Sequence, residues 1–353
     1  MPPSTVLVTG ASRFVGGQLA ARLAADATIG RILAIDTVPP GRELMGHLGR
    51  AEFIQADLRN PMIAKVISAA KVDTVVHTAL SADPWEVGEP RERPRHTPGA
   101  LKETNVIGTM QLLAACQKST TVTRLVVKST GAVYGASALD QAVFTECDEP
   151  NETPASGYAR DAREIEGYIR SFARRRADVD VTVLRFTHII GPRIDTVSSR
   201  YFALPVVPTA LGYDPRVQLL HEQDALAVLE RATRVRLPGV FNVGGDGVLL
   251  LSQAIRRAGR IPAPLPGPAL AAVGWLLRSA QLVDYSPEHT RFRTVGAVLD
   301  TTRLRTDYGF VPRWSTVQAF DDYVRGTALR PTIDPEWITA AQRSLLGLAS
   351  YFR

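Results

Sequence analysis

The sequence predicts an α/β protein in which helices cover both faces of a doubly wound parallel sheet, followed by a smaller mixed lobe. The first observation is the stretch TVLVTGASRFVGG at 5–17, where a short apolar strand turns at a glycine into a helical pattern. The second is that strand-like apolar runs and helical segments alternate regularly up to residue 186. Such alternation indicates parallel strands joined by crossover helices.

The individual elements follow from the period of their apolar residues. Strands are expected at 6–8, 31–36, 52–57, 74–79, 124–130 and 181–186. Helices are expected from residue 14 onward and at 61–70, 100–118 and 158–177, with loops at 37–50 and 81–99. Because ligands of such sheets bind outside the carboxyl ends of the strands, we expect the functional residues at that edge.

The chain divides into three regions by pattern. Residues 1–186 carry the sheet, whose core can also receive later strands. Residues 187–330 have shorter elements broken by proline and glycine, which suits a smaller substrate-binding lobe. Residues 331–353 are expected to form an amphipathic helix, which we expect to dock on the body or on a second subunit rather than on a membrane. Its apolar stripe consists of Trp337, Ala341, Leu345, Leu348 and Phe352.

The composition is that of a globular protein with a large core. Of 353 residues, 45% are hydrophobic and 22% are charged. The longest apolar stretch, 263–277, contains three prolines and is too short to span a membrane. We expect no leader before the first strand. The two cysteines, Cys116 and Cys147, indicate a reducing, cytoplasmic location, and both are expected to be packing residues.

The net charge is +6 and the pI is about 9.5, mostly from arginine spread along the chain. Because no aromatic residues are interleaved with these arginines, nucleic acid is not an expected partner. Weak attraction to anionic membrane surfaces stays open. We expect a homodimer that binds a small-molecule substrate, and no metal.

The turn after the first strand is an anion site by its physics. The first N–H groups of a helix have no partner inside the helix, and the helix dipole is positive there, so a dinucleotide diphosphate can bind. Asp36 ends the second strand, where a carboxylate would bind the adenosine ribose and repel a 2′-phosphate. Arg13 lies in the turn, where it could pair with a phosphate, pair with Asp36, or cover the adenine.

Several motifs occur in one order along the chain. They are TGASRFVG at 9–16, Asp36, ADLR at 56–59, HTA at 77–79, NVIGT at 105–109, STGAVYG at 129–135, Tyr158, LRFTHIIGP at 184–192, HEQD at 221–224 and FNVGG at 241–245. In these motifs the chain resembles the extended short-chain dehydrogenase/reductases, specifically the NAD-dependent epimerase/dehydratase family of nucleotide-sugar enzymes. The resemblance covers about residues 4–325. It implies a Rossmann fold in residues 1–186, NAD as cofactor, and oxidoreductase or isomerase chemistry.

The resemblance also implies site residues. Thr130 and Tyr158 would be the catalytic pair, in which the tyrosine oxygen moves a proton while hydride passes to or from the cofactor. The residues implied or expected to bind the cofactor are Gly10, Ser12, Arg13, Phe14, Val15, Asp36, Asp57, Leu58, Thr78, Ala79, Asn105, Lys128 and Phe186. Leu80 and His188 would contact the substrate.

The chain departs from the family's pattern beside the tyrosine. The family has a lysine one helical turn after the tyrosine, which lowers the pKa of the phenol, but here that residue is Ala162. Arg160 cannot replace the lysine, because a residue two positions along a helix points to nearly the opposite face. Lys128 could supply the charge, because it lies two residues before Thr130 and strand alternation puts both on one side. Alternatively, Lys128 binds a surface carboxylate.

A second departure concerns the substrate. The family's Asn, which binds the diphosphate, is His188 here, and its Arg, which binds the nucleotide, is Val217 with Arg216 beside it, so a UDP-sugar is possible but not favoured. Segment 261–283 carries Trp275, Leu276, Leu277 and Leu282, which could cover a greasier substrate or belong to a lid or interface helix. We therefore expect an NAD-dependent enzyme acting on a secondary alcohol of a sugar or polyol derivative, or alternatively a catalytically weak NAD-binding sensor or scaffold.

Overall fold

The computed structural model describes residues 3–81, 101–135, 137, 139–150, 157–280, 283 and 295–332. The chain forms two compact units. The first comprises Met1–Thr187, Glu222–Gly244 and Leu299–Arg313, and the second comprises His188–His221, Gly245–Val298 and Trp314–Arg353.

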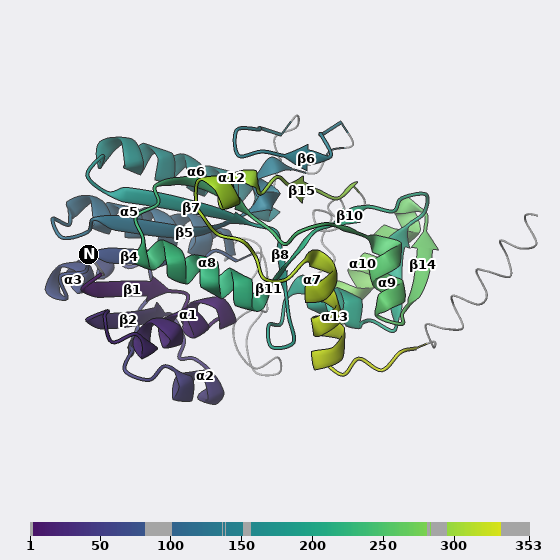
Figure 1. Ribbon diagram of the computed structural model, residues 1–353, viewed down its shortest axis with the longest axis horizontal. Coiled ribbons are helices and arrows are strands. Elements are labelled where there is room, and N and C mark those ends of the chain that lie inside the picture. Colours follow the sequence, from purple (N-terminus) through teal and green to yellow (C-terminus); the bar gives the residue numbers. More distant parts are fainter. Residues whose placement is uncertain are drawn as a thin grey trace, which may run out of the picture. The chain divides into compact units, whose positions relative to one another are not determined.

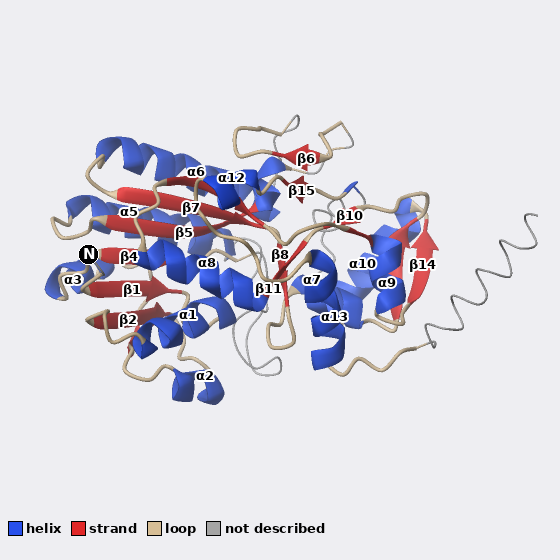
Figure 2. Cartoon of the chain, in the orientation of Figure 1, coloured by secondary structure: helices blue, strands red, loops and turns tan. Residues whose placement is uncertain are grey.

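A seven-stranded parallel sheet forms the first unit, in the order β12-β7-β5-β4-β1-β2-β3 (Figure 2). Its strands are β1 (Thr5–Thr9), β2 (Arg31–Asp36), β3 (Glu52–Gln55), β4 (Thr74–His77), β5 (Arg124–Thr130), β7 (Asp180–Phe186) and β12 (Gly239–Val243). The central strands are buried apolar runs, as a sheet covered on both faces requires. The predicted doubly wound sheet is confirmed, and it does receive a later strand, β12.

Helices lie on both faces of this sheet (Figure 1). One group, α3, α5 and α6, packs side by side, and α1 packs against α8 in the other group. The helical elements of the unit are α1 (Phe14–Ala25), α2 (Arg42–His47), α3 (Ile63–Ala69), the π-helix η1 (Glu103–Ile107), α5 (Gly108–Lys118), the 3-10 helix η2 (Gly131–Tyr134), α6 (Gly157–Arg175), α8 (Glu222–Arg234) and α12 (Thr302–Thr306). The short strand β6 (Val143–Phe144) also belongs to the first unit. It pairs with β15 (Val298–Leu299), of which Leu299 belongs to the first unit and Val298 to the second.

Several predicted boundaries are wrong. The expected loop at 37–50 contains the short helix α2, which buries no residue and therefore has no apolar period to reveal it. Strands β3 and β4 each end two residues early, because the chain turns away from the sheet to form the edge where Asp57 and Ala79 lie. Helix α3 begins at Ile63 rather than at Pro61. The expected helix at 100–118 is interrupted by the π-helical turn η1, whose wider winding no apolar period shows.

The second unit is a mixed set of short elements around its own core. They are β8 (His188–Ile190), α7 (Val197–Ala203), β9 (Val206–Ala210), β10 (Arg216–Val217), β11 (Leu219–His221), β13 (Leu249–Leu250), α9 (Leu251–Arg257), β14 (Ile261–Leu265), α10 (Gly267–Ser279) and α13 (Thr316–Gly326). Strands pair as β8 with β11, β9 with β14, and β10 with β13. The core includes aromatic residues packed against one another, with Phe202 edge-on to Phe320 at a centroid distance of 4.9 Å.

Other expectations can be compared with the described residues. Cys116 is buried, as expected of a packing residue, but Cys147 is exposed, so that expectation is wrong for Cys147. Trp275 and Leu276 lie on α10 and are 69% and 59% exposed. No helix within the described ranges is both long and apolar enough to cross a membrane. The apolar stripe at 337–352, the loop at 82–99 and Leu282 lie outside the described residues.

Candidate functional site in the first unit

The turns that follow β1 and β4 meet at the switch point of the sheet. From β1 the chain proceeds through β2 to β3 on one side, and β4 and β5 continue on the other side. Gly10 follows β1 with φ +76°, and a Cβ atom there would lie 2.9 Å from the Cα of Ala79, which follows β4. The carboxyl ends of these strands therefore form the crevice position where doubly wound sheets bind ligands.

The start of α1 sits directly on this turn. A Cβ atom at Gly16 would lie 2.2 Å from the carbonyl oxygen of Gly10 and 2.6 Å from Oγ1 of Thr78. Thr78 donates from Oγ1 to the carbonyl oxygen of Thr9 at 2.6 Å, which fixes the β4 turn against β1. Only glycine at position 16 lets the helix approach this closely, so the helix N-terminus is held at the edge of the sheet.

Asp36 is held at the end of β2 by backbone donors. Its Oδ2 accepts from the N–H of Ser12 at 3.0 Å, and its Oδ1 accepts from the N–H of Thr37 at 2.7 Å. Ser12 also donates from its hydroxyl to the carbonyl oxygen of Val38. The carboxylate is thus placed beside the glycine turn, where a ribose bound by Asp36 would lead into the helix N-terminus.

Of the three alternatives for Arg13, the described contacts speak against pairing with Asp36, whose carboxylate is bonded to Ser12 and Thr37. Arg13 is 7% exposed, and its Nη1 donates to the carbonyl oxygen of Ala79. Within the described residues its Nε is buried without a hydrogen-bond partner, and no salt bridge joins it to Asp36. The guanidinium therefore belongs to the β4 side of the turn, not to the β2 side where Asp36 lies.

A buried chain of hydrogen bonds through Thr9, His77 and Thr109 stabilises the carboxyl edge of the sheet. His77 is 2% exposed; its Nδ1 is 2.8 Å from Oγ1 of Thr9, and its Nε2 is 2.9 Å from Oγ1 of Thr109. Burial first, and then the positive charges of Arg13 and Lys128, together lower the pKa of His77 to about 4. The imidazole is therefore neutral near pH 7, and it links β1 and β4 to α5.

Asn105 lies in the π-helical turn η1 and holds Ser81, in the segment after β4, by two hydrogen bonds. Its Nδ2 donates to the carbonyl oxygen of Ser81 at 2.8 Å, and its Oδ1 accepts from the N–H of Ser81 at 3.2 Å. Thr109 donates to the carbonyl oxygen of Asn105 at 2.5 Å. Asn105 is 3% exposed, so it shapes the site through Ser81, while its predicted direct role in cofactor binding stays a prediction.

Thr130 and Lys128 lie on the same stretch of β5. The burial pattern alternates there, with Lys128 and Thr130 half-buried and Ser129 buried, as strand geometry predicts. Nζ of Lys128 donates to the carbonyl oxygen of Leu80 at 3.3 Å. Oγ1 of Thr130 accepts from the N–H of Ala132 at 3.2 Å and so caps η2. Phe186, which is also buried, pairs with Thr130 at the end of β7.

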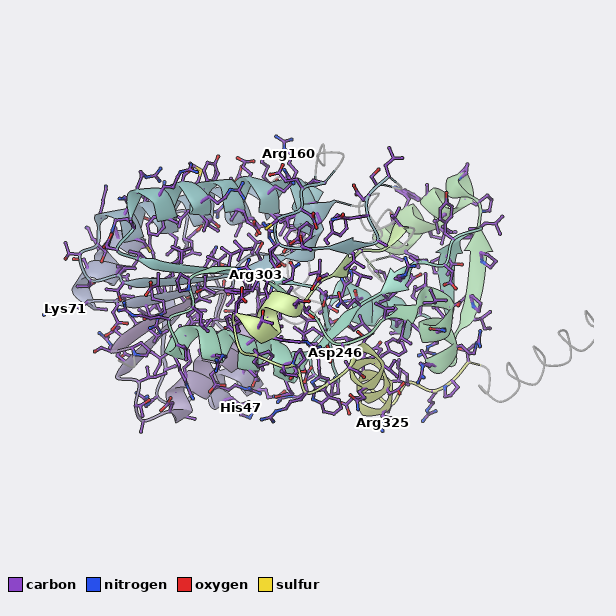
Figure 3. The ribbon with its side chains drawn as sticks, turned by 45° about the horizontal axis from the view of Figure 1, so that its top comes forward. His47, Lys71, Arg160, Asp246, Arg303 and Arg325 are labelled. Carbon is purple, nitrogen blue, oxygen red and sulfur yellow. The ribbon has the colours of Figure 1, made fainter. Side chains whose placement is uncertain are left out.

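Tyr158 lies in the first turn of α6 and is half-buried. Arg160 is exposed and points outward from α6 (Figure 3), so it does not replace the missing lysine. Ala162 is 0% exposed, and Asp161 is 7% exposed. Burial raises the pKa of Asp161, whereas the positive charge of Lys102 opposes this shift.

A buried polar network that the sequence prediction missed connects α6 to the sheet. Glu166 lies two helical turns after Tyr158, and its Oε1 accepts from the Ser129 hydroxyl at 2.6 Å. Its Oε2 lies 2.6 Å from Nη2 of Arg185 in a salt bridge. Arg185 also donates to the hydroxyl of Tyr134 at 2.7 Å, and that hydroxyl donates to Oδ1 of Asn242 at 2.7 Å. Four of these residues fall inside the recognised motifs, but their pairing depends on the fold.

The remaining predicted residues lie at several places. Asp57 bonds to Arg59, whose hydrogen bonds lower the pKa of that carboxyl, and Leu58 is buried. Phe14 and Val15 open α1 on the turn. His188 begins β8 in the second unit and is exposed, so it is not among the residues that the first unit brings together. Within the described residues, no group of three or more His, Cys, Asp or Glu side chains could hold a metal ion.

The sheet, the glycine turn and the acidic residue at the end of β2 define a Rossmann-type dinucleotide-binding protein. A family model described as "NAD dependent epimerase/dehydratase family" matches residues 6–244, and the chain belongs to this family. The resemblance seen in the sequence is thereby confirmed, and so is NAD as the cofactor, because the family is NAD dependent.

Similar proteins extend this result. An uncharacterized protein of Mycobacterium tuberculosis is 49% identical over 347 residues, which is 98% of this chain and 90% of that protein. A putative UDP-arabinose 4-epimerase of Arabidopsis thaliana is 30% identical over 53% of this chain and 41% of that protein.

Solved structures share the fold. UDP-glucose 4-epimerase from Thermotoga maritima, solved with UDP-glucose, has a TM-score of 0.68 and 19% identity, over 92% of this chain and 98% of that chain. UDP-glucuronic acid 4-epimerase from Bacillus cereus, solved with UDP-glucuronic acid and NAD, has a TM-score of 0.67 and 18% identity, over 91% of this chain and 99% of that chain. These likenesses confirm the predicted fold class.

Proposed function

We propose that this protein is an NAD-dependent enzyme of the epimerase/dehydratase type that acts on a secondary alcohol of a sugar or polyol derivative. The observation that carries the proposal is the attachment of the helix bearing Tyr158 to the strand bearing Thr130. Glu166 on α6 accepts from Ser129, the neighbour of Thr130, and Arg163 on α6 donates to the carbonyl oxygen of Val133 in η2 at 3.2 Å. The hydroxyls of Thr130 and Tyr158 are thus carried by two elements that hydrogen bonds join to one another.

The residues present fit a dinucleotide. The glycine contacts at positions 10 and 16 leave no room for a side chain beneath the turn, and the carboxylate of Asp36 lies beside the turn. Gly10, Ser12, Asp36 and the segment Thr78–Ala79 would hold the cofactor. When bound, NAD would take up or release a hydride.

The proton would be moved by this chain's own hydroxyls. Tyr158 would transfer a proton to or from the alcohol oxygen of the substrate. The hydroxyl of Thr130 accepts a backbone hydrogen bond from Ala132, so its own proton can be donated to the same substrate oxygen. This arrangement would position the alcohol between two hydroxyl groups.

The similar proteins named above support a nucleotide sugar as the broad substrate class, because they are UDP-sugar epimerases by name. His188 and Val217 replace two residues that would hold the diphosphate and the nucleotide, which favours a sugar or polyol derivative other than a simple UDP-sugar. Mass spectrometry of small molecules retained by the purified protein would identify the candidate. A homodimer remains our proposal for the assembly.

A catalytically weak NAD-binding sensor or scaffold is the second candidate. The fully buried Ala162 favours it, because no cation can act on Tyr158 from that position. A single-turnover assay that follows formation of bound NADH with the retained compound separates the two candidates. NADH formation supports the enzyme, whereas NAD binding without it supports the sensor.

A further inference from the structure

We propose that Arg13 and Lys128 form one anion-binding site that recognises the diphosphate of the dinucleotide by charge. The proposal rests on the dinucleotide-binding function proposed above. It adds that two cationic side chains attract the negative charge of the bound dinucleotide. Their cationic groups donate to consecutive carbonyl oxygens, those of Ala79 and Leu80.

The fold brings the two cations together from opposite sides. Arg13 comes from the turn after β1, and Lys128 comes from β5, and these two strands flank β4 in the sheet. Both side chains reach the segment that leaves β4, although they are far apart in the sequence. They also act on the same imidazole, because each contributes to the lowered pKa of His77. The two positive charges therefore belong to one local site.

The structure supplies little compensation for Arg13. The side chain is 7% exposed, its buried Nε has no hydrogen-bond partner within the described ranges, and no carboxylate there forms a salt bridge with it. Burial of a cation without an anion is costly. His77 stays neutral beside it and adds no charge of its own. A bound anion would relieve this cost.

The positive charges at the N-terminus of α1 favour a diphosphate as the bound anion. Arg13 is the N-cap residue of the twelve-residue helix α1, whose first turn contains no acidic side chain, so the positive end of the helix dipole adds to both cations. A diphosphate carries a negative charge on each phosphate, which matches two cations better than one carboxylate does. Arg13 faces Ala79 on the β4 side of β1, while Asp36 ends β2 on the other side, so this charge is not placed for a ribose 2′-phosphate.

Calorimetric titration tests the proposal with NAD, ADP-ribose and adenosine as probes. Arg13→Gln and Lys128→Gln are each expected to weaken NAD and ADP-ribose binding about tenfold or more and to leave adenosine binding unchanged. Wild-type affinity for NAD should fall as NaCl rises from about 50 to about 300 mM, and the double variant should show a flatter dependence. Lys65→Gln and Arg174→Gln, which remove exposed charges on α3 and α6, are the matched controls.

Folding is checked by thermal unfolding followed by circular dichroism, and Arg13→Lys preserves the charge if Arg13→Gln does not fold. Folded variants that bind NAD as tightly as wild type, with an unchanged salt dependence, would overturn the proposal while leaving NAD binding intact.

Inorganic pyrophosphate separates this proposal from the proposed function. If wild type binds no dinucleotide, the proposed function fails, and pyrophosphate then tests the cation pair alone. Binding of pyrophosphate by wild type but not by the double variant supports the site. Equal pyrophosphate binding by both proteins, or by neither, overturns it.

Discussion

The hydroxyl of Ser129 donates to Oε1 of Glu166 at 2.6 Å, and this hydrogen bond joins the strand that carries Thr130 to the helix that carries Tyr158. Arg185 forms a buried salt bridge with the same carboxylate and also reaches the hydroxyl of Tyr134, at the end of the 3-10 helix that Thr130 caps. The network therefore holds both sides of Thr130 and the buried face of α6.

Removing the charge of Glu166 should destabilise the fold strongly. Glu166→Gln leaves the guanidinium of Arg185 buried without its anion, and breaking a buried pair in this way costs about 3–5 kcal/mol. Ser129→Ala removes one neutral donor and should cost about 1–2 kcal/mol. The free energy of unfolding in urea measures both. Equal, small losses for the two variants would show that the salt bridge adds nothing to stability.

His77 should make the protein sensitive to mild acid. Its pKa is lowered from 6.5 to about 4 in the folded state, so the unfolded chain binds a proton first as pH falls. The stabilising contribution is complete above pH 6.5 and is lost as pH falls through the folded pKa of about 4, a difference of roughly 3 kcal/mol. The slope of unfolding free energy against pH between these values measures it.

The matched comparison for this titration is His77→Asn against His47→Asn. Asparagine cannot titrate, and its amide can replace the contact of Nδ1 with Thr9, so His77→Asn should flatten the acid slope. His47 is exposed on α2 (Figure 3), and its replacement should leave the slope unchanged. A His77→Asn slope as steep as that of wild type would assign the acid sensitivity to other groups.

The sheet could be predicted from sequence because its signals are local. β2 and β5 have the expected limits, since each is a buried apolar run that ends in a polar residue at the sheet edge. The glycine turn could also be predicted, because an apolar strand that turns at a glycine into a helical pattern is a local signal. Asp36 was readable for the same reason, since it ends a strand. The atoms that crowd Gly10 belong to Thr78 and Ala79, and this contact could not be read from the local sequence.

The polar network and the direction of Arg13 could not be predicted in this way. Ser129, Glu166 and Arg185 lie on three elements and meet only after α6 packs on β5 and β7. The sequence left three partners open for Arg13, and the contact with Ala79 was not among them, because Ala79 is 66 residues away. The π-helical turn at Asn105 has no apolar period and depends on packing.

Asp36 should make the protein prefer NAD to NADP. Its carboxylate, fixed by Ser12 and Thr37, would accept hydrogen bonds from ribose hydroxyls and repel a 2′-phosphate. We expect NAD to bind at least about tenfold more tightly, and Asp36→Asn to narrow that ratio. Calorimetric titration with both dinucleotides measures the ratio, and Glu43→Gln on α2 is the control for general charge. Tighter NADP binding by wild type would overturn the role of Asp36.

UDP-sugars should bind weakly or not at all. His188 and Val217 occupy the places expected to hold the diphosphate and the nucleotide, and a diphosphate that enters a buried site without partners loses its hydration at a cost. Thermal shift with UDP-glucose and UDP-galactose measures binding, and the double change His188→Asn with Val217→Arg should increase the shift. A large, saturable shift with wild type would show that other residues supply these contacts.

Tyr158→Phe and Ala162→Lys together test the catalytic assignment. Tyr158→Phe removes only the hydroxyl and should leave NAD binding nearly unchanged while lowering turnover about a hundredfold or more. Ala162→Lys places a cation on the helix face of Tyr158 and should favour the phenolate, which raises activity if nothing else supplies that charge. If Lys128 already supplies it, the new lysine should add little or hinder.

The side chain at position 162 must be tested for size as well as for charge. Ala162 is 0% exposed, so a long side chain strains the packing of α6, and Ala162→Met provides a control of similar length without charge. Activity raised by Ala162→Lys but not by Ala162→Met isolates the charge, and the pH profile of turnover should then shift to lower pH as the phenol's pKa falls. Unchanged turnover in Tyr158→Phe would show that the tyrosine is not the proton carrier. No activity in wild type or in Ala162→Lys, with any retained alcohol, would make the sensor the better description.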